Sequence, residues 1–415
     1  MTNKYIMLVN GIIGMGGGQM YTNNKLSYMK KLGWEPYVFS GMEGQIVIPT
    51  LRKYDCLIKR LMIASPMIYS RRVVNSLIDE IVNEIGDFDE AVIESGSGHM
   101  ALWGELLAKR LQCKHMVHLL DERPDVVVPK EYLDFYRFKL ERRELSGIAN
   151  TSLKILFRNS DEINEQNSYH LPSVCQNVVS DSEEGGDIEI PQTGITMGCI
   201  GRLGKRYVEA ATAAFATVAK KHADKRFNVL FIGASDEKQH EKRIRSILGV
   251  IPNVELLMPG FMYPIPQAIL NKVDVFISSA GSAGVSYRNG RPTIAIDGRD
   301  NMAIGVLGYT TTNSLYRSSE EKVDPADLLE AILFKNYLAG KTYAGKEKNV
   351  DMEILKQHIV FLKSSSREKQ YFDIAAMKAA GKDKKKKAVR FILGTQGYVR
   401  FHDKGLELLA KLRKK

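Results

Sequence analysis

The regular alternation of short apolar runs with helical stretches is the feature that most restricts how this chain can fold. It occurs twice, once in each half of the 415 residues. Two parallel strands need a long crossover between them, usually a helix, so the alternation predicts parallel sheets with helices on both faces. The predicted strands are 5–9, 36–40, 90–94, 115–120 and 154–158 in the first half, and 196–200, 228–232, 253–257, 273–278 and 293–296 in the second.

The expected fold class is therefore α/β, with two doubly wound, Rossmann-like domains. The segment 181–194 is acidic, contains glycine and includes Pro191, which is typical of a linker. The predicted divisions are a first domain at 1–180, the linker at 181–194, a second domain at 195–345, helices at 346–377 that return toward the first domain, and a basic amphipathic tail at 378–415. We expect the carboxyl ends of both sheets to face a cleft.

A glycine cluster, Gly-Met-Gly-Gly-Gly-Gln at 14–19, follows the first predicted strand and precedes a predicted helix. The dinucleotide fingerprint would require a third glycine where Gln19 stands, and no Gly-Lys-Ser/Thr follows. Two interpretations stay open. The loop binds an anion at the start of the helix, or it is a turn that needs positive φ. The candidate cleft-loop residues are Gly16, Gly17, Gly18 and Gln19.

The net charge of +11 is concentrated at one end of the chain. Residues 378–415 contain 13 basic residues against three acidic ones, which accounts for ten of the eleven net charges. The remaining body is close to neutral, and this argues against a nucleic-acid-binding protein.

The four cysteines are scattered without a Cys-x-x-Cys pair, which argues against a zinc site or a disulfide framework and suits a reducing cytosol. No metal site is expected. The N-terminal apolar run is interrupted by Asn10 and leads into glycines, so it is predicted to be a strand and not a signal peptide. No apolar run reaches the length of a membrane span.

The second half opens with a strand that ends at Gly201, followed by Arg202 and Lys205 before a helix. Two cations at a strand-to-helix junction suit a diphosphate, because they offset its charge and Arg offers a bidentate fork. The plain alternative is that they are exposed basic residues at a helix start.

Several motifs then occur in a recognisable order. They are Gly-Arg-Leu at 201–203 with Lys205, a strand ending in Ile232-Gly233, Gly260-Phe261, Asp-Val-Phe-Ile-Ser at 274–278, and Gly-Arg-Pro-Thr-Ile-Ala-Ile-Asp at 290–297. This order resembles the nucleotide-binding domain of GT-B glycosyltransferases, especially the family-four group of bacterial polysaccharide enzymes. The resemblance covers about residues 195–300 and is looser in the first half.

Carried over to this chain, the resemblance implies a donor site. Arg202 and Lys205 would clamp the diphosphate of a sugar nucleotide, and Gly260 and Phe261 would hold the base. The small residues Gly281, Ser282, Ala283 and Gly284 would donate N–H groups to the phosphates, unless they only form a packed turn.

One departure from the family concerns two glutamates that bind the donor sugar and ribose. Residues 275–296 contain no Asp, Glu or His, and Val285 stands where the second glutamate would fall. The retaining chemistry that the family implies is therefore left open. Asp297 is the nearest carboxylate and a candidate substitute, with a strand-end cap as the alternative.

Two first-half segments place polar residues directly after predicted strands, where a catalytic base for a sugar hydroxyl would lie. The candidates are His99, His118, Asp121 and Glu122. His118 lies within a strand, where a histidine is more often a core residue. Asp121 and Glu122 open a loop and are favoured, although Arg123 could simply pair with either.

The tail mixes lysine clusters with Phe391, Ile392, Leu393, Tyr398 and Phe401. This pattern favours the surface of an anionic membrane. A nucleic-acid-binding tail and a solvated disordered end are the alternatives.

Together these features predict a cytoplasmic glycosyltransferase, peripheral on the inner face of the cell membrane. It would move a sugar from a UDP- or GDP-linked donor, without a cofactor, to a lipid-linked acceptor of a cell-surface polysaccharide such as a capsule or exopolysaccharide. The alternatives are a sugar-nucleotide epimerase of the same fold and a non-catalytic glycosyltransferase-like partner protein.

Overall fold

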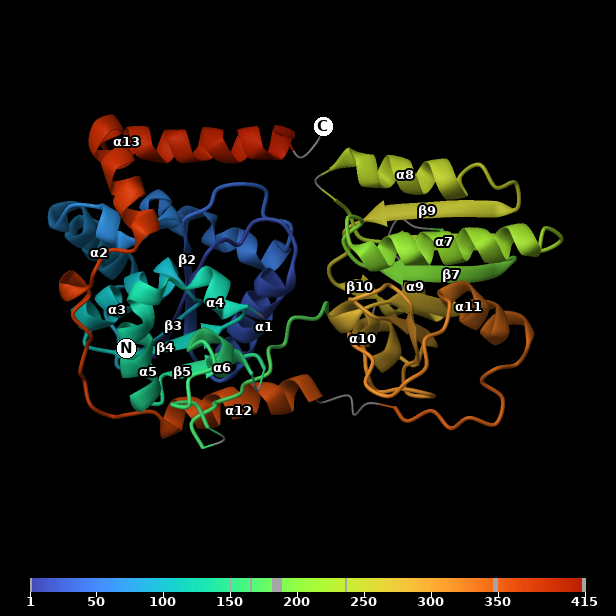
Figure 1. The fold of residues 1–415 in the computed structure, drawn as a ribbon, viewed down its shortest axis with the longest axis horizontal. Coiled ribbons are helices and arrows are strands. Elements are labelled where there is room, and N and C mark those ends of the chain that lie inside the picture. Colours follow the sequence, from blue (N-terminus) through green and yellow to red (C-terminus); the bar gives the residue numbers. More distant parts are fainter. Residues whose placement is uncertain are drawn as a thin grey trace. The chain divides into compact units, whose positions relative to one another are not determined.

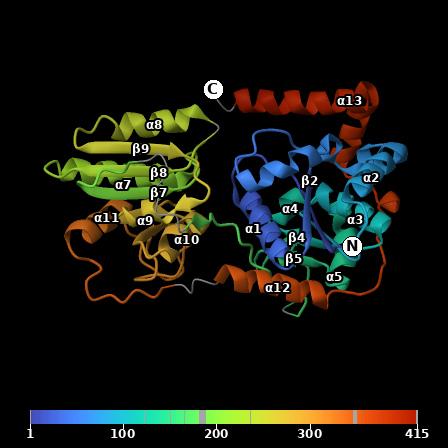
Figure 2. The ribbon, with the colours of Figure 1, turned by 180° about the vertical axis from the view of Figure 1, so that it is seen from behind.

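The computed structural model describes residues 2–121, 123–149, 151–164, 166–180, 189–235, 237–345 and 350–412. They form two compact units, each built on its own sheet (Figures 1 and 2). The first unit contains the described residues up to 175 and those from 351 onward, and the second contains 176–350. The boundary between the units, after residue 175, lies before the predicted end of the first domain at residue 180. The reason is that β6 (Val179–Ser180) pairs with β10 (Ile265–Pro266) of the second unit. Of the predicted linker, residues 181–188 lie outside the described residues.

The first unit has a five-stranded parallel sheet with the order β2-β1-β3-β4-β5. Its inner strands are buried along almost their whole length, as expected when helices cover both faces of a parallel sheet. In chain order its elements are β1 (Lys4–Val9), α1 (Gly17–Lys31), β2 (Glu35–Ser40), η1 (Pro49–Leu57), η2 (Arg60–Ile63), η3 (Pro66–Ile68), α2 (Arg71–Ile85), β3 (Ala91–Ser95), α3 (His99–Leu111), β4 (Lys114–Leu119), α4 (Pro124–Val127), η4 (Lys130–Tyr132), α5 (Leu133–Glu141), β5 (Leu145–Gly147), α6 (Ser152–Leu156), α12 (Val350–Ser364), η5 (Ile374–Ala376) and α13 (Gly381–Leu412).

One strand predicted for the first half is wrong. Residues 154–158 fall in α6 and the turn after it, and the fifth strand is β5 instead. The apolar run from Ile155 to Phe157 is too short for its periodicity to distinguish a strand from a helix. The other four predicted strands coincide with β1 to β4 to within one residue at each end.

The second unit has a six-stranded sheet with the order β13-β12-β11-β7-β8-β9, parallel except for the antiparallel edge pair β12 and β13. Read from β9, the strands are third, second, first, fourth, fifth and sixth along the chain, which is the Rossmann order. Besides β6 and β10, its elements are β7 (Ile195–Ile200), α7 (Arg206–Lys221), β8 (Phe227–Ile232), α8 (Lys238–Leu248), β9 (Val254–Gly260), α9 (Gln267–Asn271), β11 (Val275–Ser278), α10 (Ala280–Arg288), β12 (Thr293–Ile296), β13 (Ala303–Val306) and α11 (Pro325–Phe334).

A buried polar cluster fixes α1 to the sheet of the first unit. Lys25 Nζ of α1 lies 3.3 Å from Glu94 Oε2 of β3, and both side chains are almost fully buried. Tyr21 donates a hydrogen bond to Glu94 Oε1 at 2.6 Å, and Tyr5 donates to Oε2. Burial raises the pKa of Glu94, but the neighbouring side chains, with the Lys25 ammonium first among them and the Tyr21 hydrogen bond included, together lower the value to about 2. A buried carboxylate is tolerated only with such partners, so the cluster specifies how α1 packs.

His358 extends this cluster to α12. Its Nδ1 lies 3.0 Å from Lys25 Nζ, and its Nε2 lies 2.9 Å from the carbonyl oxygen of Pro172. An ammonium can only donate and a carbonyl can only accept, so we assign a neutral ring with its proton on Nε2. Helix α12 is thereby hydrogen-bonded to α1 through a side chain that must stay uncharged.

The basic C-terminal segment forms α13, a helix kinked at Gly394 (φ 70°). Tyr398 and Val399 are buried in the cluster that also contains Trp103. Asp383 accepts a hydrogen bond from Tyr132. In Figures 1 and 2 the red helix lies along elements of the first unit. The described part of the tail is therefore packed structure, which excludes a solvated disordered end for these residues.

Replacing Tyr398 by Ala should lower the unfolding free energy of the first unit by about 3 kcal/mol, as for other aromatic-to-alanine changes in a core. Tyr398 is 3% exposed, whereas Phe401, three residues further along α13, is 57% exposed. Urea denaturation of Tyr398→Ala and of the matched control Phe401→Ala measures the difference. Equal stability of the two variants would contradict the packing of α13.

The unfolding free energy should also fall as the pH falls from 7 to 5. Burial lowers the pKa of His115 and His118 to about 4 and that of His358 to about 2. The unfolded chain takes up protons near its ordinary histidine pKa of about 6.5, and the folded chain does not. Stability is thus fully present above that value and is lost below it, by about 1 to 2 kcal/mol per histidine at pH 5.

Urea denaturation at both pH values tests this with His358→Gln, which should show a smaller pH effect than the parent chain. His170→Gln is the control, because His170 is exposed. The same pH dependence in His358→Gln and the parent chain would show that His358 is not buried as a neutral ring.

Candidate functional site

In a doubly wound sheet, ligands bind beyond the carboxyl ends of the strands, at the point where the strand order reverses. In the second unit this point lies between β7 and β11, which pair in parallel. Ser278, the last residue of β11, holds the two strand ends together. Its Oγ donates to the carbonyl oxygen of Ile200 at 2.9 Å and lies 3.1 Å from the Ile200 nitrogen. The loops that follow these two strands are therefore neighbours.

Backbone segments approach each other closely at this edge. A Cβ on Gly201 would lie 1.9 Å from the Tyr207 hydroxyl oxygen, and a Cβ on Gly233 would lie 1.9 Å from the carbonyl oxygen of Gly201. Both glycines also have positive φ, at 155° and 153°. Gly260, which was predicted to contact the nucleobase of the donor, ends β9 at φ 85°. Its carbonyl oxygen accepts a hydrogen bond from the Gly233 nitrogen at 2.8 Å. At Gly233 the conflicting atom belongs to the backbone, so only glycine fits there, and the three strand ends are packed tightly together. Phe261 follows and is half-buried.

Arg202 and Lys205 lie in the loop after β7, and both side chains are exposed. Lys205 is the N-cap residue of α7, and its nitrogen donates to the carbonyl oxygen of Arg202 at 3.0 Å. Among the described residues, the Arg202 guanidinium has no hydrogen-bond or ion-pair partner. Its charge is therefore available to a ligand at the strand ends.

The first turn of α10 supplies the other side of this point. Gly281, Ser282 and Ala283 lie in it and Gly284 follows, with no acidic residue and no side-chain cap. The Ala283 nitrogen donates to the carbonyl oxygen of Ser279 at 3.3 Å, so of the four predicted donors only Gly281 and Ser282 have N–H groups that precede the hydrogen bonds of the helix. The expected capping residue, Ser279, instead donates from Oγ to the carbonyl oxygen of Ile296 at 2.8 Å. An uncapped helix start without acidic residues favours an anion.

Tyr207 connects the two loops, and sequence reasoning missed it. Its hydroxyl donates to the carbonyl oxygen of Ile200 at 3.3 Å, and the same oxygen lies 3.4 Å from Ser282 Oγ. The group thus bridges the end of β7 and the first turn of α10. The sequence places Tyr207 two residues after Lys205, which was the one indication of its role. Hydrophobic periodicity does not distinguish it from other residues at the start of a helix.

Val285, at the position of the family's second glutamate, is a core residue. It is buried with Ile200, Phe276 and other apolar side chains. A carboxylate at this position would be buried in an apolar cluster.

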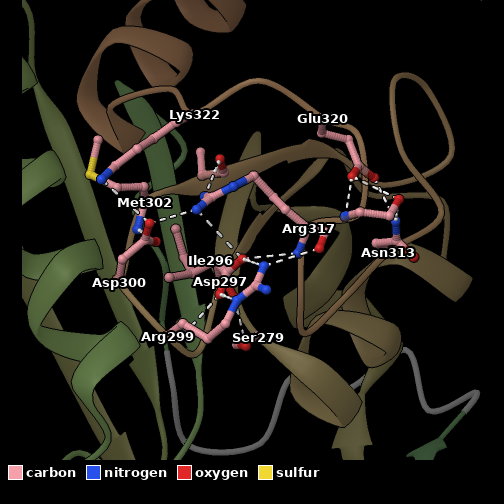
Figure 3. A network of polar contacts seen from close by, with 12 residues as sticks. Ser279, Ile296, Asp297, Arg299, Asp300, Met302, Asn313, Arg317, Glu320 and Lys322 are labelled. Carbon is pink, nitrogen blue, oxygen red and sulfur yellow. Dashed lines mark hydrogen bonds and ion pairs between the residues drawn. The ribbon is translucent and has the colours of Figure 1, made fainter.

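Asp297 is buried, and both of its oxygens are occupied, as Figure 3 shows. Arg299 donates to Oδ1 from Nε at 2.9 Å and to Oδ2 from Nη2 at 2.6 Å, and the Arg317 nitrogen donates to Oδ2 at 2.9 Å. Hydrogen bonds from Arg299 hold the pKa of Asp297 far below its usual range. Arg317 also pairs with Asp300. This network anchors the loop after β12, so the cap alternative accounts for Asp297 better than a donor contact does.

In the first unit the strand order reverses between β1 and β3. The glycine cluster lies there, but it does not fill the loop as expected, because Gly17 and Gly18 begin α1 and Gly16 is its extended N-cap. Gly14 alone of the cluster has positive φ, at 67°. A Cβ on Gly18 would meet no atom within 4 Å. Packing therefore does not require glycine at Gly18, and the first turn of α1, without a cap or an acidic residue, leaves its N–H groups open. Gln19 closes the loop by donating to the carbonyl oxygen of Gly11 at 3.0 Å.

Asp121 lies just beyond the end of β4 and is half-buried. It accepts a hydrogen bond from Ser97, in the loop after β3. Arg123 pairs with Asp125 at 2.9 Å, which removes the expected alternative of an Arg123–Asp121 pair. Glu122 lies outside the described residues. Asp121 is thus a carboxylate at the carboxyl edge of the sheet.

The two candidate histidines are less suited to catalysis. His118 is buried within β4, with Nδ1 2.9 Å from Ser146 Oγ, and its low pKa keeps it neutral. His99 begins α3, and burial and then the Lys386 charge lower its pKa to about 4. These placements favour the core-residue interpretation of His118 and leave Asp121 as the best-placed described candidate.

Among the described residues, no cluster of three or more His, Cys, Asp or Glu side chains could hold a metal ion. Within the same part of the chain, no helix has both the length and the apolar character of a membrane span.

No protein-family model matches this chain, and no curated protein matches its sequence. Solved structures do resemble it. A glycosyltransferase from Rickettsia africae has a TM-score of 0.57 and 16% identity, covering 88% of this chain and 100% of that one. HepE from Anabaena, in complex with UDP-glucose, has a TM-score of 0.53 and 14% identity, covering 87% and 99%. A UDP-GlcNAc 2-epimerase from Neisseria meningitidis, bound to UDP-GlcNAc, has a TM-score of 0.47 and 12% identity, covering 87% and 100%. The two closer likenesses, together with the strand orders, show a GT-B-like fold of two Rossmann-like domains.

Proposed function

We propose that this protein is a glycosyltransferase that moves a sugar from a nucleotide-diphosphate donor to a lipid-linked acceptor of a cell-surface polysaccharide. One observation carries the proposal. At the strand-order reversal of the second unit, the Arg202 loop and the uncapped first turn of α10 are joined by Tyr207. An exposed guanidinium and open helical N–H groups at one point suit a diphosphate. The GT-B-like fold and the order of motifs shared with family-four enzymes support the same assignment.

In this proposal the second unit binds a UDP- or GDP-linked sugar without a metal or cofactor. Arg202 and Lys205 neutralise the diphosphate, the N–H groups of Gly281 and Ser282 donate hydrogen bonds to it, and Gly260 and Phe261 contact the nucleobase. The Tyr207 hydroxyl keeps the two phosphate-binding loops in register. The protein would act in the cytoplasm on a capsule or exopolysaccharide precursor.

The first unit would bind the acceptor at its own strand-order reversal, beside the open first turn of α1. Asp121 is the proposed general base for the acceptor hydroxyl, and Ser97 orients its carboxylate. Glu122 remains a second candidate for the same role.

A non-catalytic nucleotide-sugar-binding protein is the second candidate function. It is favoured by Val285, whose buried apolar side chain replaces a donor-binding glutamate. Incubation with a nucleotide sugar, with and without a glycan acceptor, separates the candidates. A transferase hydrolyses the donor slowly and transfers it to an acceptor, a binding protein does neither, and an epimerase would convert the donor without any acceptor.

Arg202→Ala should weaken nucleotide-sugar binding by about 1.5 to 3 kcal/mol, because a hydrogen bond to a charged group is lost. Lys205→Ala should have an effect of the same order. Arg226→Ala is the matched control, because Arg226 is exposed and precedes β8 at the opposite edge of the same sheet. Isothermal titration with UDP- and GDP-sugars measures each affinity. Affinities unchanged in both loop variants would remove this loop from the donor site.

Asp121→Asn should lower turnover while leaving donor affinity nearly unchanged, because a base acts in the chemical step and lies in the other unit. Asp134→Asn is the control, since Asp134 is an exposed carboxylate on α5 that pairs with Arg137. Glu122→Gln should be measured beside it. Full activity in both the Asp121 and Glu122 variants would refute the base assignment.

A further inference from the structure

Three consecutive exposed apolar side chains lie just before the kink of α13. Phe391 is 81% exposed, Ile392 is 79% exposed, and Leu393, next to the kink at Gly394, is also exposed. Val250 and Val360 stand singly in the sequence, and among the other described residues only Val126 and Val127 form an exposed adjacent pair. Single exposed apolar residues need no explanation, whereas adjacent ones indicate a surface that is covered in use.

Exposed lysines precede these residues on the same helix. They are Lys382, Lys384, Lys385 and Lys387. Residues four or seven positions apart share a helix face, so Lys384 and Lys387 lie on the face of Phe391, and Lys385 lies on the face of Ile392. We call Lys384, Lys385, Lys387, Phe391 and Ile392 the basic apolar face.

The acidic residue within this stretch does not neutralise the face. Asp383 is buried and accepts a hydrogen bond from Tyr132, so it points into the unit. Asp403, further along the helix, pairs with Arg60. The exposed charges of residues 382–393 are therefore all positive.

The orientation of α13 is fixed by its other side. Arg390 Nε donates to the carbonyl oxygen of Ile68 at 3.1 Å, and Tyr398 is packed against Tyr69 with ring centroids 6.5 Å apart. Because these contacts attach one side of the helix to the unit, the basic apolar face cannot turn inward. Its exposure follows from the packing of the helix.

We propose that the basic apolar face of α13 binds the surface of an anionic lipid bilayer. Lysines at such a surface are attracted to lipid phosphates, and Phe391 and Ile392 insert among the acyl chains. A second copy of the chain would bring like charges together. A nucleic acid would contact the lysines but offer no apolar partner for Ile392 and Leu393. This inference does not depend on the donor site.

The test uses the full chain and its sedimentation with vesicles of phosphatidylcholine, with or without phosphatidylglycerol. The full chain should sediment with the anionic vesicles only, and less of it should do so as salt is raised. Lys384→Ala/Lys385→Ala/Lys387→Ala should lower the partition coefficient by about 100-fold, because each basic residue near the surface contributes a factor of about five. Phe391→Ser/Ile392→Ser should lower it by at least about tenfold and leave the remaining binding more sensitive to salt.

Two matched controls keep the result specific. Val360→Ser removes a 67% exposed apolar side chain of α12, in the same unit. Lys220→Ala/Lys238→Ala/Lys242→Ala removes three exposed lysines of the second unit. Both should sediment like the parent chain, and all variants should show its circular dichroism spectrum. Equal binding to both kinds of vesicle, or undiminished vesicle binding by the variants of the basic apolar face, would overturn the proposal. So would competition by RNA that releases the protein from the vesicles, or self-association of the parent chain that these variants lose.

Discussion

The close approach of backbone at the carboxyl ends of β7, β8 and β9 is the constraint on which the candidate donor site depends. Gly233 has no room for a side chain, because the Gly201 carbonyl oxygen occupies that space, and the Tyr207 hydroxyl lies in the corresponding space beside Gly201. The loop after β7 therefore lies directly against the strand ends. This packing brings the exposed Arg202 to the same point as the first turn of α10.

Buried polar contacts fix the loops and helices beside the carboxyl edge of the sheet in each unit. In the second unit, Asp297 and its arginines fix the loop that follows β12. In the first, the Lys25–Glu94 pair fixes α1, whose open first turn contains Gly17 and Gly18 of the glycine cluster. Both carboxylates are buried and fully occupied, so they shape sites without contacting a ligand. Charge that remains exposed, as at Arg202 and on α13, is what a ligand or a lipid can reach.

Much of the fold could be predicted from the sequence because near-continuous apolar runs mark parallel strands, and nine of the ten predicted strands have a counterpart in the structure. The run at Ile155 was misassigned because three apolar residues do not define a period. Gly201 and Arg202 could be found through the order of motifs. Tyr207, Glu94 and His358 could not, because their roles depend on contacts between segments far apart in the chain. A charged residue within a buried strand, as Glu94 is, was the one signal for the cluster.

The central claim is that a nucleotide sugar binds where β7 and β11 end. Hydrogen–deuterium exchange of the full chain, with and without a saturating UDP- or GDP-sugar, tests it most directly. Bound phosphates would occupy backbone N–H groups and slow their exchange, so peptides that cover 199–208 and 278–286 should be protected. The account predicts protection of both segments, with little change across the opposite edge of the same sheet. Protection confined to the first unit, or absent from both segments, would contradict it.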